Sequence, residues 1–524
     1  MAEAPPGARD GLSSVTRGTL VMMLGTLGFV AESFVARVLL IRGLTPDEWA
    51  NFFVGLTLVG LLSAIGGLGI PSAVARTLPF EGDPREQRRV VRTSLYVVIP
   101  SAIALSGLLA LLSLPIRVTF QSPLLAETLL FFAVAVGLSI VGGLLAAIFQ
   151  GYEDVLPNAL FVQVANPTLF ILFLWIAKGS GPFRIPYTSA LAAYTLSGVL
   201  AMAALLAYTR LSLPLHLPRG PSEPGVSSRL LRFAMPLFVV VLLGFVAGNV
   251  DALVLAAVDR SAVAFYSADL SLARLLQIGL GSLGFIILPV TARFVRLGDT
   301  ASVRTTYTTA TKWMVLTSLP LFLIFFLFPA PSLTFVYTAS YAGTGVPLQI
   351  MLLGAFASTI VGPSTAAQVA FGQTRLLLYN TAIAATVDII LSVVLIPPLG
   401  VTGAALAWTA ATGLYPVLSM AELAATVGVH PFRRHYLLPL VVTAVPSAAA
   451  LFLVPFAPPL WSLPLIVLGI AGLFVLVVLV SRSLDSGDVL LLEALENVLG
   501  TRLTGLRRFG RRFLPPVPPH RSDP

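Results

Sequence analysis

Long apolar runs alternate with short polar loops along the chain. The hydrocarbon core of a bilayer is about 30 Å thick, and a helix needs roughly 20 consecutive apolar residues to cross it. A window of that length predicts fourteen membrane-spanning helices. The predicted spans are 18–42, 50–75, 91–114, 124–149, 156–177, 188–208, 229–257, 262–290, 310–337, 344–371, 376–396, 401–426, 436–456 and 461–481. The expected fold class is therefore all-α, a polytopic membrane protein with about 14 transmembrane helices.

The composition excludes a soluble globule and several kinds of chemistry. Hydrophobic residues make up 57% of the 524 residues, charged residues make up only 10%, and the mean hydropathy is +0.93. Soluble domains carry about 25% charged residues, so this chain lacks the polar surface that water requires. The sequence has no cysteine and only four histidines. We therefore expect neither a metal site nor a resident cofactor.

The positive charges predict how the spans are oriented. Cytoplasmic loops of membrane proteins carry an excess of lysine and arginine. Here 25 of the 32 lysine and arginine residues fall in alternate loops and the two termini, six fall on the opposite side, and Arg274 lies within a span. We expect a multi-pass protein of the cell membrane with both termini in the cytoplasm. The loops account for the net charge of +9, so nucleic acid is not an expected partner.

A weak internal repeat divides the chain into two halves. The recurring positions, at offsets of 221 or 222 residues, are Gly151 and Gly372, Asn158 and Asn380, and Asn166 and Asp388. This spacing predicts two pseudo-symmetric six-helix lobes in parallel orientation, followed by two extra helices. The predicted parts are an N-terminal lobe (1–208), a cytoplasmic linker (209–228), a C-terminal lobe (229–426), two extra spans (427–481) and a basic cytoplasmic tail (482–524). An amphipathic helix in the tail is expected to lie on the anionic surface of the bilayer.

Six ionisable residues interrupt the apolar spans and form the candidate site. A charge near the bilayer centre costs about 2.5–3.5 kcal/mol on insertion scales, so such residues normally face a bundle interior or a wet cavity. The candidates for a substrate-binding or ion-binding cavity are Glu32, Arg37, Asp251, Asp269, Arg274 and Asp388. Asp251 and Asp269 are expected at similar depth, with Arg274 deeper.

Simpler interpretations of these charges stay open. Glu32 and Arg37 lie five residues apart, about 140° around a helix, so they need separate partners. Arg37 is alternatively a side chain that extends to the outer interface. Asp251, Asp269 and Arg274 alternatively form a structural salt bridge between neighbouring helices. For Glu422, near a cytoplasmic end, a structural role is expected.

Three stretches of the chain resemble a known family of transporters. They are ARVLLIRGLTPDEWANFFVGLTLVGLLSAIGGLGIPSAVARTLP (36–79), VDALVLAAVDRSAVAFYSADLSLARLLQIGLGSLGFIILPVTARF (250–294) and IPPLGVTGAALAWTAATGL (396–414). Their order and small-residue spacing resemble the polysaccharide-exporting flippases of the multidrug/oligosaccharidyl-lipid/polysaccharide (MOP) exporter superfamily. The resemblance implies two six-helix lobes around a central cavity, with cavity charges that engage the diphosphate of a lipid carrier or a coupling ion. By position, it implies that role for Glu32, Arg37, Asp251, Asp269 and Arg274.

Several functions follow from this pattern, and one is favoured. The leading hypothesis is a flippase that moves a polyprenyl-phosphate-linked or polyprenyl-diphosphate-linked saccharide outward by alternating access, with glycan-assembly enzymes as partners. In it, Arg274 and Arg37 attract phosphate, while Asp251 and Asp269 hold the arginine or bind a coupling ion, H⁺ or Na⁺. The alternatives are a cation-coupled exporter of drugs or metabolites, a polyprenyl-dependent glycosyltransferase and a non-transporting scaffold. Because the outer loops are short and have no paired carboxylates, we expect a transporter without catalytic residues.

Overall fold

The computed structural model describes most of the first 432 residues, and the described chain is helical. The described residues are 6–81, 83–119, 123–178, 183–212 and 224–432, with the single positions 465, 468, 469, 472 and 476. Within them there are helices and no β-strand, which confirms the all-α fold class. They include ten segments that are long and apolar enough to cross a membrane. Apart from the five single positions, the predicted spans 436–456 and 461–481 and the tail 482–524 lie outside the described residues.

The N-terminal half follows the first six predicted spans. Its elements are α1 (Pro6–Gly43), α2 (Pro46–Gly67), α3 (Ile70–Thr77), η1 (Leu78–Phe80), α4 (Pro84–Thr119), α5 (Pro123–Gly151), η2 (Asn158–Ala165), α6 (Asn166–Ala177) and α7 (Tyr187–Ser212). The second span consists of α2 and α3, and the fifth consists of η2, a π-helix, and α6. At its C-terminal end α7 extends into the predicted linker.

The C-terminal half follows the next six predicted spans. Its elements are α8 (Pro224–Val258), α9 (Ala262–Leu275), α10 (Ile278–Arg296), α11 (Thr300–Leu327), α12 (Pro329–Val336), η3 (Ala339–Thr344), α13 (Gly345–Val361), α14 (Ser364–Ala370), α15 (Thr374–Leu399) and α16 (Val401–Val427). The eighth span is broken between α9 and α10, just as the second is broken between α2 and α3. α8 begins inside the predicted linker, of which residues 213–223 lie outside the described part.

The break in the second span brings two helices into close contact. Leu68 and Gly69 have φ values of 51° and 70°, in the left-handed region that glycine adopts without strain. A Cβ atom on Gly69 would lie 2.3 Å from the carbonyl oxygen of Ala234 in α8. Glycine therefore lets α8 pass directly over the α2–α3 break, and a side chain there would push the helices apart.

A capping box sets the first residue of α2. The backbone N–H of Glu48 donates to Thr45 Oγ1 at 3.3 Å, and Glu48 Oε2 accepts from the backbone N–H of Thr45 at 2.8 Å. This reciprocal pair satisfies N–H groups that a helix start leaves free. Pro46 occupies the first helical position, where its missing N–H costs nothing. The cap thereby fixes the orientation of Trp49, which is fully buried one turn later.

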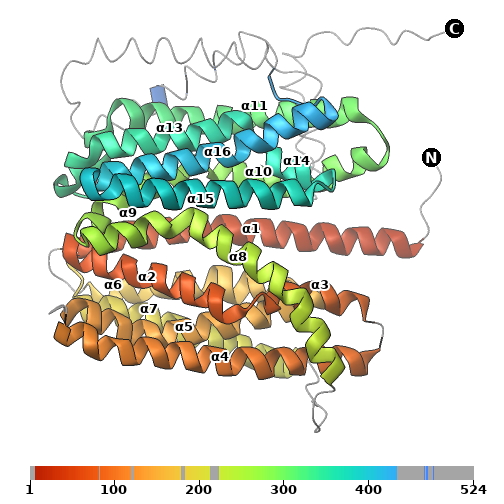
Figure 1. Cartoon of the computed structure of the whole chain (residues 1–524), viewed down its shortest axis with the longest axis horizontal. Helices are drawn as coiled ribbons and strands as arrows, with labels where there is room; N and C mark the ends of the chain where they lie inside the picture. The colour runs from red at the N-terminus through yellow and green to blue at the C-terminus, as the bar shows by residue number, and fades with distance from the viewer. Residues whose placement is uncertain are drawn as a thin grey trace.

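Two groups of helices make up the molecule, with α1 and α8 lying between them (Figure 1). We call α2–α7 the N lobe and α9–α16 the C lobe. α1 packs against η2 and α6 of the N lobe and against α10 of the C lobe. α8 packs along α15 and α16 and also crosses onto α2, α3 and α4. Side chains of α1 and α8 are therefore placed where the two lobes meet.

Candidate functional site

The two charges of α1 turn toward different lobes, as their separation around the helix predicts. Glu32 Oε1 accepts from the Thr168 hydroxyl of α6 at 3.0 Å, and its Oε2 is buried without a hydrogen-bond partner among the described residues. Arg37 Nη1 donates to Ser271 Oγ of α9 at 2.8 Å, and its guanidinium lies 5.8 Å from the ring centre of Phe53. Glu32 therefore belongs to the N-lobe side, and Arg37 lies at the boundary of the lobes.

Hydrogen bonds join the lobes at the end where α1 stops and α2 begins. The indole N–H of Trp49 in α2 donates to Ser267 Oγ of α9 at 2.8 Å. Arg42, in the last turn of α1, donates from Nε to the Val336 carbonyl at 2.8 Å and from Nη2 to the Phe335 carbonyl of α12. This is the end that the charge pattern predicts to face outward, so the lobes are closed there.

Arg37 and Arg274 bring two positive charges together beside this closed end. Arg274 Nη2 donates to the Gly248 carbonyl of α8 at 2.9 Å, and the two guanidinium groups are close enough to interact as like charges. Neither arginine forms a salt bridge with a described acidic side chain, although Asp251 is close enough to Arg274 to attract it electrostatically. Like charges at close range in a low-dielectric setting are unfavourable unless an anion or water compensates them. The pair is thus suited to a negatively charged group.

Asp251 and Asp388 form a second cluster, between α8 and α15. Both are fully buried and close enough to interact electrostatically. Asp251 Oδ1 accepts from the Ala252 N–H at 2.8 Å, and its Oδ2 accepts from the Tyr266 hydroxyl. Both carboxylate oxygens of Asp388 lack a hydrogen-bond partner in the described part of the chain. A buried carboxylate without partners is costly, so this cluster is suited to a proton or a cation.

Asp269 lies apart from the arginines. It is fully buried, its Oδ1 accepts from the Thr344 hydroxyl of η3 at 3.0 Å, and its Oδ2 has no partner among the residues described. Neither Asp269 nor Asp251 forms a salt bridge with Arg274 in this part of the structure. The six predicted residues thus fall into an arginine pair, an aspartate pair and two separate carboxylates.

Sequence reasoning missed the partners of these charges. Tyr266 is fully buried and donates to Asp251, although it stands only three residues before Asp269. Ser271 and Ser267 are spaced one turn apart on α9 and receive the hydrogen bonds of Arg37 and Trp49. A small-residue face at this spacing was the available signal, but it is equally typical of simple helix packing.

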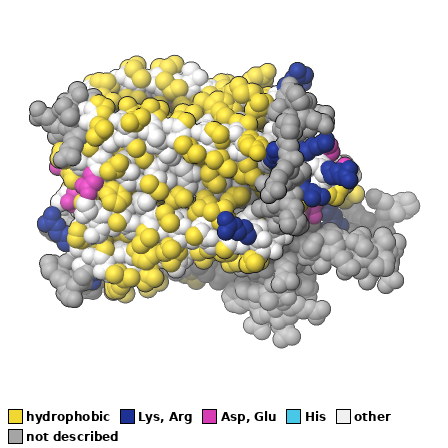
Figure 2. All heavy atoms as spheres, turned by 90° about the horizontal axis from the view of Figure 1, so that it is seen from below, with side chains coloured by type: hydrophobic (Ala, Val, Ile, Leu, Met, Phe, Trp, Pro, Cys, Tyr) yellow, Lys and Arg dark blue, Asp and Glu magenta, His cyan; other side chains and the backbone are white. Residues whose placement is uncertain are grey.

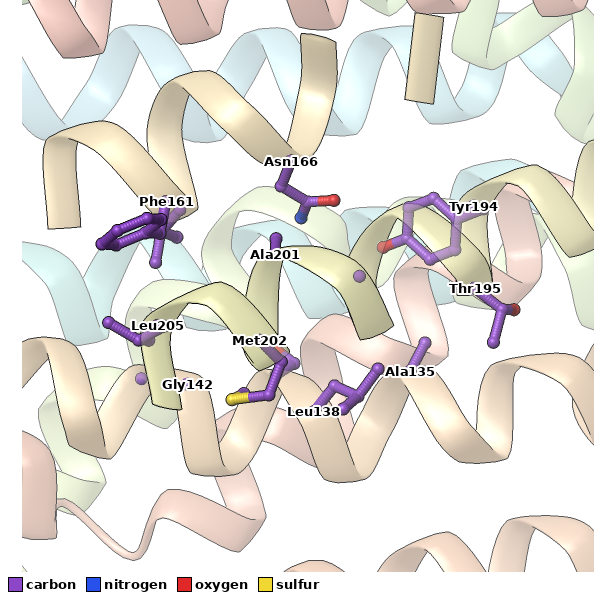
Figure 3. A pocket seen from close by; sticks show the side chains of 14 residues that line it. Ala135, Leu138, Gly142, Phe161, Asn166, Tyr194, Thr195, Ala201, Met202 and Leu205 are labelled. Atoms are coloured by element: carbon purple, nitrogen blue, oxygen red, sulfur yellow. The ribbon is translucent and has the colours of Figure 1, made fainter. Parts of the chain in front are cut away.

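Sequence reasoning also missed a cavity inside the N lobe, between α5, η2, α6 and α7. It has a volume of about 260 Å³ and includes the neutral polar side chains of Ser139, Asn166, Tyr194 and Thr195. Figure 3 shows Asn166 pointing into it from the start of α6. Asn166 is the predicted repeat counterpart of Asp388, so the equivalent positions carry an amide in one lobe and a carboxylate in the other.

Glu422 has the structural role expected for it. Its Oε2 accepts from Gln368 Nε2 at 2.5 Å and from Asn380 Nδ2 at 2.8 Å. Asn380 Nδ2 is also 3.4 Å from Ser419 Oγ. The carboxylate thus ties α14, α15 and α16 together near the C-terminal end of α16.

Comparisons with known proteins agree with this architecture. The lipid II flippase MurJ in its inward closed conformation superposes with a TM-score of 0.67 at 15% identity, over 86% of this chain and 97% of that chain. An inward-facing multidrug resistance MATE family transporter of the MOP superfamily gives 0.60 at 16% identity, over 79% of this chain and 99% of that chain. A MOP superfamily transporter from Pyrococcus furiosus gives 0.55 at 16% identity, over 79% and 95% of the two chains.

The sequence comparisons identify the family. No curated protein sequence matches the chain. At identities of 15–16% the solved structures show a shared fold, that of polytopic helical transporters. Residues 15–295 match the family model described as polysaccharide biosynthesis protein, which is more than half of the chain. The chain therefore belongs to the polysaccharide biosynthesis protein family and has the fold of the MOP superfamily transporters.

Proposed function

We propose that this protein is a flippase that moves a lipid-linked saccharide from the cytoplasmic to the outer leaflet. The observation that carries the proposal is the arginine pair, Arg37 of α1 and Arg274 of α9. The pair lies where the lobes meet and forms no salt bridge with a described acidic side chain, and the one carboxylate that attracts Arg274, that of Asp251, does not balance two positive charges. Guanidinium groups bind phosphate oxygens through several N–H donors at once. A phosphate or diphosphate headgroup matches both the charge and the hydrogen-bonding capacity of this pair.

The arrangement accounts for each part of such a substrate. The phosphate groups lie against Arg37 and Arg274, and the buried Ser271 hydroxyl, which accepts from Arg37 and donates to the Ser267 carbonyl, holds Arg37 in position. The polyprenyl tail stays in the bilayer, where it loses no hydrophobic contact. Family membership supports a saccharide substrate. The fold shared with a lipid II flippase supports movement of a lipid-linked headgroup between leaflets.

Alternating access requires the closed end to open. The hydrogen bond of Trp49 across the lobes and the hydrogen bonds of Arg42 from α1 to α12 would break in that step. The contacts of α1 with α6 and α10, and those of α8 with both lobes, would remain as the connections. Each such bond contributes roughly 0.5–1.5 kcal/mol net, a barrier that substrate binding can offset. In the proposed orientation both termini are cytoplasmic, the protein lies in the cell membrane, and glycan-assembly enzymes deliver its substrate.

The aspartate pair is the proposed place for a coupling ion. Asp388 has two buried oxygens without partners in the described part of the chain, and Asp251 lies beside it. The described residues contain no group of three or more histidine, aspartate or glutamate side chains placed to hold a metal ion. The two carboxylates and the Tyr266 hydroxyl offer oxygen atoms that H⁺ or Na⁺ would bind. Binding there would neutralise charge between α8 and α15 and so bias the packing of α8 on the two lobes.

The second candidate is a cation-coupled exporter of drugs or metabolites. The observation in its favour is that the C lobe buries carboxylates while the N lobe contains a neutral cavity of about 260 Å³. The shared fold of a multidrug transporter is compatible with it. In this case Asp388→Asn would abolish transport and Arg274→Ala would leave it unchanged.

The test is reconstitution into proteoliposomes with a fluorescent polyprenyl-diphosphate saccharide. The measured quantity is the fraction of labelled lipid that reaches the opposite leaflet. Arg274→Ala is expected to reduce the rate at least tenfold, since one charge-assisted hydrogen bond to phosphate contributes about 1.5–3 kcal/mol. Arg375→Ala is the matched control, an exposed arginine at the cytoplasmic end of the C lobe, and it should transport normally. Full transport by folded Arg274→Ala would refute the assignment.

A further inference from the structure

An open apolar groove runs along the side of the N lobe that is formed by α4, α5 and α7, and none of its lining residues belongs to the arginine pair. It has a volume of about 680 Å³ and lies between α4, α5 and α7. Its walls include Ile103 of α4, Leu130 and Val134 of α5 and Leu206 of α7, which are exposed by 68%, 56%, 48% and 43%. Figure 2 looks onto the molecule from the α4 side and shows a mainly hydrophobic surface, with more of the visible lysine and arginine side chains toward one end than toward the other.

Small residues make the groove deep enough for a hydrocarbon chain. Gly137 of α5 lies so close to α4 that a Cβ would come within 2.8 Å of Ser106 Oγ, so these helices touch at the floor. Gly107 faces open space, with no atom within 4 Å of a Cβ at that position. The α4 lining runs from Ile99 to Ala110, about 16 Å along a helix. One leaflet of the hydrocarbon core is about 15 Å thick, so the groove spans the depth of one acyl chain.

Two helices lead from the groove to arginines at the same end. On α7, Leu206 lines the groove and Arg210 follows four residues later on the same face, exposed at the end of the helix. On α4, Tyr96 and Arg92 precede Ile99 by one and two turns.

The α4 residues form an interfacial pair. The Arg92 guanidinium lies 5.2 Å from the ring centre of Tyr96, and Tyr96 is 62% exposed. Tyrosine is typical of the membrane interface, and arginine of the headgroup level beside it. Arg92 lies about 10 Å along α4 from Ile99. Arg92 and Arg210 therefore lie one to two helical turns beyond the apolar lining at the same end, at the expected level of the headgroups.

We propose that this groove is a binding site for an anionic phospholipid. One acyl chain lies between α4, α5 and α7, and the headgroup phosphate lies between Arg92 and Arg210. The charge complementarity selects an anionic over a zwitterionic lipid, and the depth of the groove places that lipid in the leaflet on the arginine side. The proposal does not depend on the transported substrate, since no groove residue belongs to the arginine or aspartate pair.

The test is native mass spectrometry of the full chain in detergent, titrated with phosphatidylglycerol or with phosphatidylcholine of the same acyl chains. The wild type is expected to bind phosphatidylglycerol more tightly. The double variant Arg92→Gln with Arg210→Gln should weaken phosphatidylglycerol binding by about fivefold for each arginine and leave phosphatidylcholine binding unchanged. The matched control is Arg293→Gln with Arg375→Gln, two exposed arginines of the C lobe at the same end, which should bind both lipids as the wild type does.

A second variant tests the groove itself. Gly107→Leu places a side chain in the groove at a position where the added Cβ meets no atom within 4 Å, and it should weaken binding of both lipids. Gly413→Leu on α16, where an added Cβ is equally unobstructed, should not. Unchanged thermal unfolding of each variant establishes that the fold is intact. Equal affinity of the wild type for the two lipids, or wild-type binding by the arginine double variant, would overturn the proposal, as would unaltered binding by Gly107→Leu.

Discussion

Buried side chains in the N lobe are apolar or neutral, whereas the C lobe and α8 bury charge. In the described N lobe, the rings of Phe52, Phe132, Phe170 and Tyr194 contact one another, with centroids 4.9–6.4 Å apart. Such stacked and edge-on pairs stabilise a core beyond their buried area. The buried polar residues of that lobe are serine, threonine and asparagine.

On the C-lobe side, Asp251, Asp269, Lys312 and Asp388 are all buried. A buried charge is expensive and persists where function uses it. Asn166 and Asp388 show the contrast at a single predicted repeat position, which carries a neutral amide in one half of the chain and a carboxylate in the other. Two lobes of the same helical architecture therefore differ in the chemistry of their interiors, and the proposed ion site lies on the side that buries charge.

The largest effect is expected from Asp388→Asn, which replaces the buried carboxylate of the C lobe with the neutral amide found at Asn166. Transport driven by an imposed H⁺ or Na⁺ gradient should lose its gradient dependence, a loss of roughly 5- to 150-fold in rate, the range of ordinary coupling free energies. The measurement is the rate of lipid movement in proteoliposomes with and without each gradient.

Glu422→Gln is the matched control for that experiment. It also neutralises a carboxylate of the C lobe, yet its amide oxygen can still accept from Gln368 and Asn380. It should keep both rate and gradient dependence. Retained dependence in Asp388→Asn would show that the buried aspartate is structural and that the two lobes do not differ in function.

A smaller effect is expected from the neutral lobe, and on stability rather than coupling. Phe132 is fully buried, 5.1 Å from Phe52 and 4.9 Å from Tyr194. Phe132→Ala should lower the free energy of unfolding by about 3–5 kcal/mol through lost burial and a cavity. Thermal unfolding in detergent measures this, with Phe80→Ala, at a site 84% exposed, as the control. A gradient-dependence defect in the folded Phe132→Ala protein would contradict the neutral role of this lobe.

The smallest effect is expected at the turn between α8 and α9. Asp259 accepts from the Ser261 hydroxyl at 2.7 Å and from the Ala262 N–H at 3.2 Å. The Ser261 hydrogen bond holds the pKa of Asp259 below its ordinary value. A lowered pKa contributes stability that is present above about pH 4 and is lost as the pH falls through the folded-state value.

Between pH 5 and pH 3, the Tm of Asp259→Asn is expected to fall slightly less than that of the wild type. The difference corresponds to less than about 1 kcal/mol in the free energy of unfolding, because the site is exposed. Thermal unfolding across that pH range measures it. Identical pH profiles for the two proteins would show that the hydrogen bonds of Asp259 do not contribute to stability.

Hydropathy predicted the helices well because span length and apolar content are properties of composition. Each of the first twelve predicted spans coincides with described helices. The break at Leu68 and the π-helix at Asn158–Ala165 were not predicted, because they depend on backbone conformation and hydrogen bonding that composition does not report.

The candidate site was predicted as a set of charges but not as an arrangement. Depth follows from counting residues along a span, whereas the direction of a side chain depends on how helices pack. In the structure Arg37 and Arg274 lie close enough to interact as like charges. Asp269 accepts a hydrogen bond from Thr344 of η3, and Asp251 accepts one from Tyr266. Whether these six residues bind substrate or ion stays a prediction.

Binding of the substrate's phosphate groups by Arg37 and Arg274 can be tested with two substrates that differ only at the headgroup linkage. A fluorescent saccharide is attached to the same polyprenyl chain through a diphosphate or through a neutral ether, and its movement across proteoliposomes is followed for the wild type and for Arg37→Ala with Arg274→Ala. The wild type is expected to move the diphosphate lipid but not the ether lipid, and the double variant is expected to move neither. Equal movement of both lipids by both proteins would contradict it.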